Sequence, residues 1–175
     1  MRAMTIAKLV VAFALGTLGA AVAPNAARAD APPQPGQEVT DLKPFAGTWS
    51  CTGKTKDGKT FTATAVFTQS KELNGFWYDA RYTRDKTKDA PGFAGHGILG
   101  FDTANSKYYF TGVDSFGGWA VLVGSMSNKV LDLAGNSNQG GHVTPFKFKL
   151  DASGKPNTLV WQIGPALEDE NDCKH

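Results

Sequence analysis

The sequence predicts an all-β domain, an antiparallel meander of about 8–10 strands closed into a barrel. From Asp41 onward, short runs of β-forming residues are broken by turn residues every eight to twelve positions. Tight-turn sequences such as Lys56-Asp57-Gly58 and Leu73-Asn74-Gly75 join neighbouring runs. Strands that fold back on one another leave two exposed edges unless the sheet closes, which favours a barrel over an open sandwich.

The first 29 residues have the layout of a secretory signal peptide. Arg2 and Lys8 precede an apolar run from Leu9 to Ala23. Ala27-Arg28-Ala29 follows that run and has the form of an A-x-A cleavage site. The run is too short and too rich in Ala and Gly for a good membrane span. We therefore expect cleavage after Ala29 and a periplasmic or secreted protein without a stable membrane anchor. An uncleaved N-terminal anchor is the alternative.

Loss of the signal peptide changes the charge of the protein. Removing 29 of the 175 residues leaves 146, enough for one domain with a single core. Arg2, Lys8 and Arg28 leave with it, so Lys plus Arg falls from 18 to 15 against 16 acidic residues, and the net charge moves from +2 to −1. This balance gives no reason to expect a nucleic-acid partner or an anionic membrane surface.

The mature chain divides into a lead-in, a barrel and a tail. Residues 30–40 contain three prolines and little to bury, which predicts a disordered lead-in. The barrel is expected over residues 41–166, with one helical turn over Asp41–Phe45. The charged residues in 167–175 predict an acidic, solvated C-terminal tail.

Nine strands are expected within the barrel. The long connection Asp85–Ala94 is charged and contains Pro91-Gly92, which is typical of a rim loop or lid. The expected strands are Gly47–Thr55, Thr60–Gln69, Phe76–Arg84, Gly95–Asp102, Lys107–Val113, Trp119–Met126, Val130–Gly135, Thr144–Asp151 and Thr158–Gly164.

One face of most strands is apolar. Phe61, Ala63, Ala65 and Phe67 alternate with threonines, and the same period-2 pattern recurs in several later strands. These faces point inward, where they either fill the barrel or line a cavity for one small ligand. The candidate ligand-binding residues are Trp49, Phe61, Phe67, Tyr78, Tyr82, Phe110, Phe146 and Trp161.

Cys51 and Cys173 are the only cysteines. An even count in an exported chain favours one intramolecular disulfide, although free thiols and intermolecular pairing remain open. Strand parity turns Cys51 to the same side as Trp49, toward the interior. The bond would then pin the C-terminus across the closing seam, with the tail tucked into the barrel end or the register of the first strand shifted by a bulge.

No local motif supports a cofactor or a metal. Gly95-His96-Gly97-Ile98-Leu99-Gly100 matches G-x-G-x-x-G by letter, but a strand and not a helix follows, so the glycines are expected to allow a bulge or sharp coiling instead of dinucleotide binding. His96, His142 and His175 are the only histidines, and their spacing matches no metal motif. We expect no metal, no haem and no catalytic residue that the sequence can name.

Asp79 and Arg81 share the face opposite to the apolar one on their strand. The simple interpretation is an exposed cross-strand ion pair. The alternative is a buried Arg81 that orients an anionic ligand.

Two short motifs resemble known barrel families. Gly47-Thr48-Trp49, on the first expected strand, is similar to the first signature of the lipocalin and calycin group. Leu42–Trp49 together with Gly97–Asp102 resembles more closely an uncharacterised bacterial family labelled a domain of unknown function, over about Asp41–Gly164. The resemblance implies a calycin-like barrel with a ligand cavity and carries over no catalytic residue.

The sequence departs from the lipocalin pattern near that tryptophan. Lipocalins usually place a late arginine over it, whereas the last arginine here is Arg84. Lys147 or Lys149 would have to take that place. Related haem-binding barrels use a histidine near the C-terminus, and neither His142 nor His175 has a matching context.

The function expected from these features is binding of a small apolar or amphipathic molecule in the barrel. One alternative is a cavity enzyme of isomerase or cyclase type, with Tyr78, Arg81 or His96 supplying a proton or a charge. A second is an envelope structural or interaction protein that displays Asp85–Ala94 without a ligand. The oligomeric state is left open.

Overall fold

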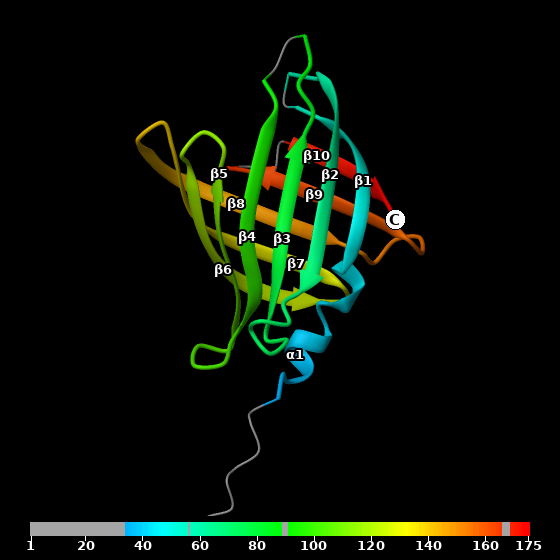
Figure 1. The fold of residues 1–175 in the computed structure, drawn as a ribbon, viewed down its shortest axis with the longest axis vertical. Coiled ribbons are helices and arrows are strands. Elements are labelled where there is room, and N and C mark those ends of the chain that lie inside the picture. Colours follow the sequence, from blue (N-terminus) through cyan, green and yellow to red (C-terminus); the bar gives the residue numbers. More distant parts are fainter. Residues whose placement is uncertain (1–33, 56, 89–90, 166–168) are drawn as a thin grey trace, which may run out of the picture. The chain divides into compact units, whose positions relative to one another are not determined.

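Ten antiparallel strands close into one barrel in the computed structural model, which describes residues 34–55, 57–88, 91–165 and 169–175 (Figure 1). Each strand pairs with its neighbours in the sequence, and the last strand pairs with the first. The predicted all-β meander closed into a barrel is thereby confirmed. The strands are β1 (Gly47–Lys54), β2 (Thr60–Gln69), β3 (Trp77–Arg84), β4 (Phe93–Asp102), β5 (Lys107–Asp114), β6 (Trp119–Ser127), β7 (Val130–Gln139), β8 (His142–Asp151), β9 (Thr158–Gly164) and β10 (Asp169–Lys174).

The alternation of apolar and polar residues fixes which face of each strand is inside. In β2, Phe61, Ala63, Ala65 and Phe67 are buried, while the threonines between them are exposed. Cross-strand partners keep the same side, as where Ala65 lies opposite both Trp49 of β1 and Tyr82 of β3. A shift of one residue would turn the whole apolar set toward solvent, so the pattern specifies the register.

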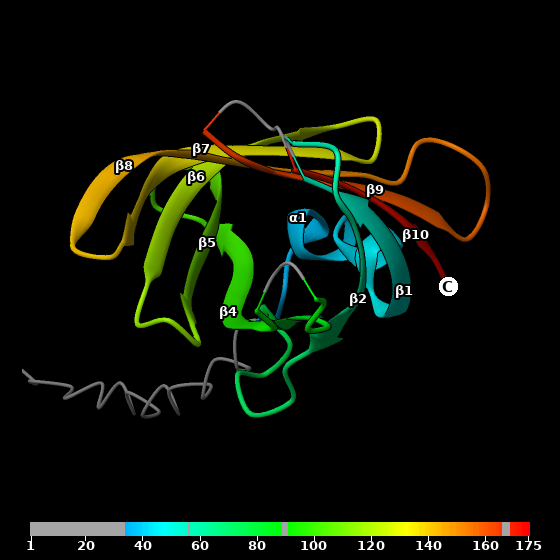
Figure 2. The same cartoon turned by 90° about the horizontal axis from the view of Figure 1, so that it is seen from above.

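Two short helices plug one end of the barrel. They are α1 (Gln37–Thr40) and the 3-10 helix η1 (Lys43–Phe45), and Figure 2 shows α1 within the ring of strands. Val39, Leu42 and Phe45 are buried against the core. The expected helical turn in Asp41–Phe45 thus occurs as η1, while α1 takes up the last four residues of the stretch expected to be disordered.

The expected acidic tail is wrong, because Asp169–Lys174 form the tenth strand and complete the barrel. Glu170, Asp172 and Lys174 face solvent, whereas Asn171 and Cys173 are buried. A strand whose inward face holds a polar amide and a half-cystine lacks the apolar alternation that predicts strands. The domain therefore extends past residue 166.

A disulfide joins the two strands that close the barrel. Cys51 of β1 lies directly opposite Cys173 of β10, with a Cα–Cα distance of 4.0 Å, and the two sulfurs are bonded. The pairing and its place at the closing seam are as predicted. Cys51 faces inward without a bulge, because an extra strand carries Cys173 into register with it.

A histidine packs beside Trp49, where the lipocalin resemblance predicts a basic side chain. The imidazole of His175 stands edge-on to the Trp49 indole at 5.1 Å, and Trp49 Nε1 donates a hydrogen bond to the Phe45 carbonyl at 2.8 Å. Gly47 has φ of 127°, and a Cβ there would collide with the His175 ring. Lys147 and Lys149 lie on the outward-facing positions of β8 and do not substitute.

The predicted signal peptide lies outside the residues that the structure describes. Within those residues, no helix has the length and apolarity needed to cross a bilayer.

Candidate ligand-binding cavity

A belt of small residues leaves space inside the barrel near the end opposite α1. Ala80, Gly97, Gly112, Ala120 and Ser137 are consecutive cross-strand partners on β3 to β7. These five neighbouring inward positions carry at most one side-chain heavy atom beyond Cβ. They therefore leave a gap inside the barrel, which the side chains of the opposite wall do not fill. A cavity of about 100 Å³ remains there.

The glycines of the belt are required by close packing. A Cβ on Gly97 would collide with the carbonyl oxygen of Thr111, and it would lie 2.9 Å from the ring of Phe110. Phe110 also lies against Gly112. Gly95-His96-Gly97 is therefore part of a strand that lines a cavity, and no helix follows it.

Aromatic rings make up the remaining wall of the cavity. Phe110 and Phe148 are stacked, with centroids 5.2 Å apart and planes at 12°. Trp161 meets Tyr82 at 4.6 Å and Phe148 at 5.2 Å, both edge to face. Such pairs hold rings in fixed orientations, so this wall is preorganised.

The cavity opens into a wider mouth of about 420 Å³ at the end of the barrel away from α1. Phe61, Arg84, Phe116 and Asp169 line this mouth. The residues that line both the cavity and the mouth are Tyr82, Phe93, Asp114, Gln139, Phe146 and Ile163. Because these walls are shared, a ligand could occupy both spaces at once.

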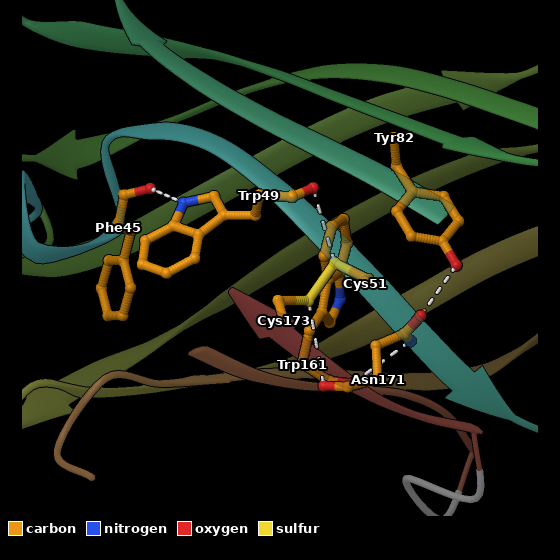
Figure 3. The surroundings of a disulfide bond; sticks show 7 residues. All are labelled: Phe45, Trp49, Cys51, Tyr82, Trp161, Asn171 and Cys173. Atoms are coloured by element: carbon orange, nitrogen blue, oxygen red, sulfur yellow. Dashed lines mark hydrogen bonds between the residues drawn. A yellow bond between two sulfur atoms is a disulfide. The ribbon is translucent and has the colours of Figure 1, made fainter. Parts of the chain in front are cut away.

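A buried polar chain stands beside the cavity, between β3, β10 and β9. The Tyr82 hydroxyl donates to Asn171 Oδ1 at 3.1 Å, and Asn171 Nδ2 donates to the Trp161 carbonyl at 3.3 Å (Figure 3). Burial raises the pKa of Tyr82, and the nearby charge of Arg84 opposes the shift. With its proton committed to Asn171, Tyr82 serves to position the wall and not to donate to a ligand.

Arg84 lines the mouth, next to Phe93, which lines both the mouth and the cavity. Its guanidinium is stacked over the rings of Phe61, at 5.2 Å, and Phe93, at 5.9 Å. Its Nε is buried and has no hydrogen-bond partner among the described residues. The indole Nε1 of Trp161 is a second buried donor without a partner there. Unpaired buried donors are uncommon and costly, about 1–3 kcal/mol each.

The predicted ligand-binding residues separate into three groups. Tyr82, Phe110, Phe146 and Trp161 line the cavity, and Phe61 lines the mouth. Trp49, Phe67 and Tyr78 line neither, because they are buried in the packed core. Phe67, for example, packs behind Trp161 with centroids 5.7 Å apart.

Sequence reasoning missed Phe93, Arg84 and Asn171. Phe93 is in phase with Gly95 and Gly97, which would have marked it as inward had the strand been extended by two residues. Arg84 is likewise in phase with Tyr82, but a charged residue at an inward position contradicts the apolar pattern. Nothing in the acidic sequence around Asn171 marks it as buried.

The side chains proposed for a cavity enzyme do not meet inside the barrel. Tyr78 is buried in the core, whereas Arg81 and His96 are exposed partners on the outer face. On this exposed face, Asp79 of β3 approaches Nε2 of His96 on β4 at 3.7 Å, which is a cross-strand contact. A buried Arg81 is also excluded. Within the described residues, no three His, Cys, Asp or Glu side chains are grouped as metal ligands would be.

Comparison with known protein families gives a match over residues 34–163 to a family described as "Protein of unknown function (DUF1579)". The chain belongs to the DUF1579 family. This agrees with the resemblance seen in Leu42–Trp49 and Gly97–Asp102. A search of the curated proteins gave no match. The DUF1579 match ends at residue 163, so it leaves out β10 and the disulfide partner Cys173.

Proposed function

We propose that this DUF1579 protein binds one small amphipathic molecule, with an apolar part in the cavity and a polar part in the mouth. The observation that carries the proposal is an apolar, aromatic-walled cavity that opens through shared walls into the mouth. A typical ligand pocket measures about 300–1,000 Å³, which the 100 Å³ cavity alone does not reach. The ligand therefore extends into the 420 Å³ mouth.

The first test is native mass spectrometry of the protein purified from its native organism. A bound small molecule that dissociates on unfolding is the expected result. Straight-chain alcohols of increasing length provide a second readout, since each buried methylene contributes about 0.8 kcal/mol, or roughly a fourfold gain in affinity. An affinity that does not change with chain length would contradict the proposal.

A pair of variants ties that binding to the cavity. Ala120→Leu places a larger side chain in the belt, and it should abolish alcohol binding. Ala134→Leu makes the same change on the outward, exposed face of the neighbouring strand, and it should leave binding unchanged. If both variants lost alcohol binding equally, or if neither lost it, the binding site would lie elsewhere.

We further propose that the protein acts in the periplasm or as a secreted protein, after cleavage following Ala29. The Cys51–Cys173 disulfide supports this, because such bonds persist in oxidising compartments. The mass of the protein from its native organism provides the test: a mature chain beginning at Asp30 is expected, and an intact N-terminus would contradict it.

A further inference from the structure

We infer that the mouth selects ligands whose polar end is an anionic acceptor of the carboxylate type, held by Arg84. This inference rests on the proposed binding function and specifies the chemistry of the ligand. It comes from the unusual state of Arg84 itself, whose Nε is removed from water and has no replacement partner in the part of the chain that the structure describes.

The Arg84 guanidinium is fixed in place before any ligand arrives. Phe61 of β2 and Phe93 of β4 lie on the two strands that flank β3, and each ring is within 6 Å of the guanidinium carbon. An arginine held between two rings loses little further freedom when it binds a carboxylate, and its planar fork fits two carboxylate oxygens.

Among the described residues, no carboxylate lies within 4.0 Å of the Arg84 guanidinium. The contacts of this kind between described residues are Lys59 with Asp57 and His96 with Asp79, and neither involves Arg84. An acceptor from a ligand would satisfy the buried Nε and balance the positive charge in one step. Because Arg84 is half-buried, such a bond would be partly shielded from water, which strengthens it.

Two acidic residues, among those the structure describes, line the mouth and must be weighed against this inference. Asp114 Oδ1 accepts hydrogen bonds from the backbone N–H groups of Phe116 at 2.8 Å and Gly118 at 2.9 Å, so this carboxylate caps the turn after β5. Asp169 also lines the mouth. Its negative charge raises the pKa of Tyr82, whereas the positive charge of Arg84 lowers it. A mouth governed by Asp169 would prefer a cation, which the experiment includes as an outcome.

The experiment compares three eight-carbon probes, octanoate, octanol and octylammonium, by calorimetric titration at pH 7. For the unaltered protein we expect octanoate to bind about 10- to 100-fold more tightly than octanol, the range of a charge-assisted hydrogen bond. Octylammonium should bind more weakly than octanol. Arg84→Gln should bring octanoate down to the affinity of octanol, while octanol itself keeps its affinity. Arg84→Lys, which keeps the charge and loses the fork, should give an intermediate value.

The control is Arg81→Gln, which removes the same charge from the exposed outer face of the same strand. It should preserve the preference for octanoate. Retention of octanol binding shows that each variant is folded around its cavity.

The outcomes separate the two proposals. Equal binding of octanoate and octanol, a preference for octylammonium, or equal effects of Arg81→Gln and Arg84→Gln would overturn the role of Arg84 and leave cavity binding intact. If no probe binds the unaltered protein, the proposed function itself fails, and the inference about Arg84 fails with it.

Discussion

The closed and open ends of the barrel are built on the same strands with side chains of different size. Leu99, Leu122 and Leu133 are at most 1% exposed in the packed part of the core. Two residues nearer the mouth, on the same inward faces of β4 and β6, the residues that replace Leu99 and Leu122 are Gly97 and Ala120, and both line the cavity. A change from leucine to glycine or alanine over one inward step along these two strands therefore accompanies the change from packed core to cavity. The backbone ladder continues unchanged through both.

This difference separates stability from binding. The packed end buries large apolar side chains and supplies most of the hydrophobic stabilisation, at about 25 cal/mol per Å² of apolar surface removed from water. The open end leaves part of that surface uncovered and contains Arg84, whose buried Nε has no hydrogen-bond partner among the residues described. Substitutions at the packed end should therefore change the free energy of unfolding, whereas substitutions at the open end should change ligand affinity.

The largest expected effect comes from the seam between β1 and β10, which closes the barrel. Replacing Cys51 and Cys173 with alanine removes a bond between residues 122 positions apart. The free energy of unfolding should fall by about 2–5 kcal/mol, since a cross-link over a long loop restricts the unfolded chain strongly. Urea denaturation measures the loss. The folded fraction should still bind octanol, because neither sulfur lines the cavity.

Two outcomes would contradict this prediction. A change in the free energy of unfolding below about 0.5 kcal/mol would mean that the pairing of β1 with β10 holds the seam without the bond. Loss of octanol binding by protein that remains folded would mean that the seam shapes the cavity.

An intermediate effect is expected from one substitution made at both ends. Ala65→Leu adds three heavy atoms to a position that is 0% exposed, and it should cost about 1–3 kcal/mol through overpacking. Ala120→Leu makes the same change at the cavity, where space exists, and it should alter stability by less than about 0.5 kcal/mol. Thermal and urea unfolding of the two variants measure the contrast. Equal destabilisation would show that the open end is as tightly packed as the closed end.

Much of the fold could be predicted from the sequence because β2, β3, β8 and β9 alternate between apolar and polar residues. Thr60–Gln69 and Thr158–Gly164 begin and end at the predicted residues. The tenth strand could not be predicted, since its inward residues are Asn171 and Cys173 and its stability comes from pairing with β1 and β9. Backbone pairing with strands distant in sequence leaves no local pattern.

The site was predictable only in part, for a related reason. Phase along a strand shows that Tyr82, Phe110, Phe146 and Trp161 face inward, and they do line the cavity. Phase gives no position along the barrel axis, so the same reasoning selects Trp49, Phe67 and Tyr78, which lie in the core. The cavity is defined by small residues that become neighbours only through the register. Arg84 could not be identified as a residue of the site, because a charged side chain on a strand usually lies on the outward face.

The smallest expected effect concerns the plug at the closed end. The Tyr108 hydroxyl donates a hydrogen bond to the Glu38 carbonyl of α1 at 3.1 Å. Tyr108→Phe should therefore lower the free energy of unfolding by about 0.5–1.5 kcal/mol at pH 7. Hydrogen exchange of the α1 amides should also become faster, while octanol affinity stays the same because the cavity lies at the other end.

The pH dependence of this difference provides a sharper test. Burial, aided by the negative charges of Asp41 and Glu38, raises the pKa of Tyr108 to about 12 from 10.0. Above pH 10 the unfolded chain loses this proton before the folded one does, so the unaltered protein loses stability as the pH rises toward 12. The variant has no such proton, and the stability gap between the two should narrow between pH 10 and 12. A gap that stayed constant over that range would show that the Tyr108 hydroxyl is solvated and that α1 is held by Val39, Leu42 and Phe45 alone.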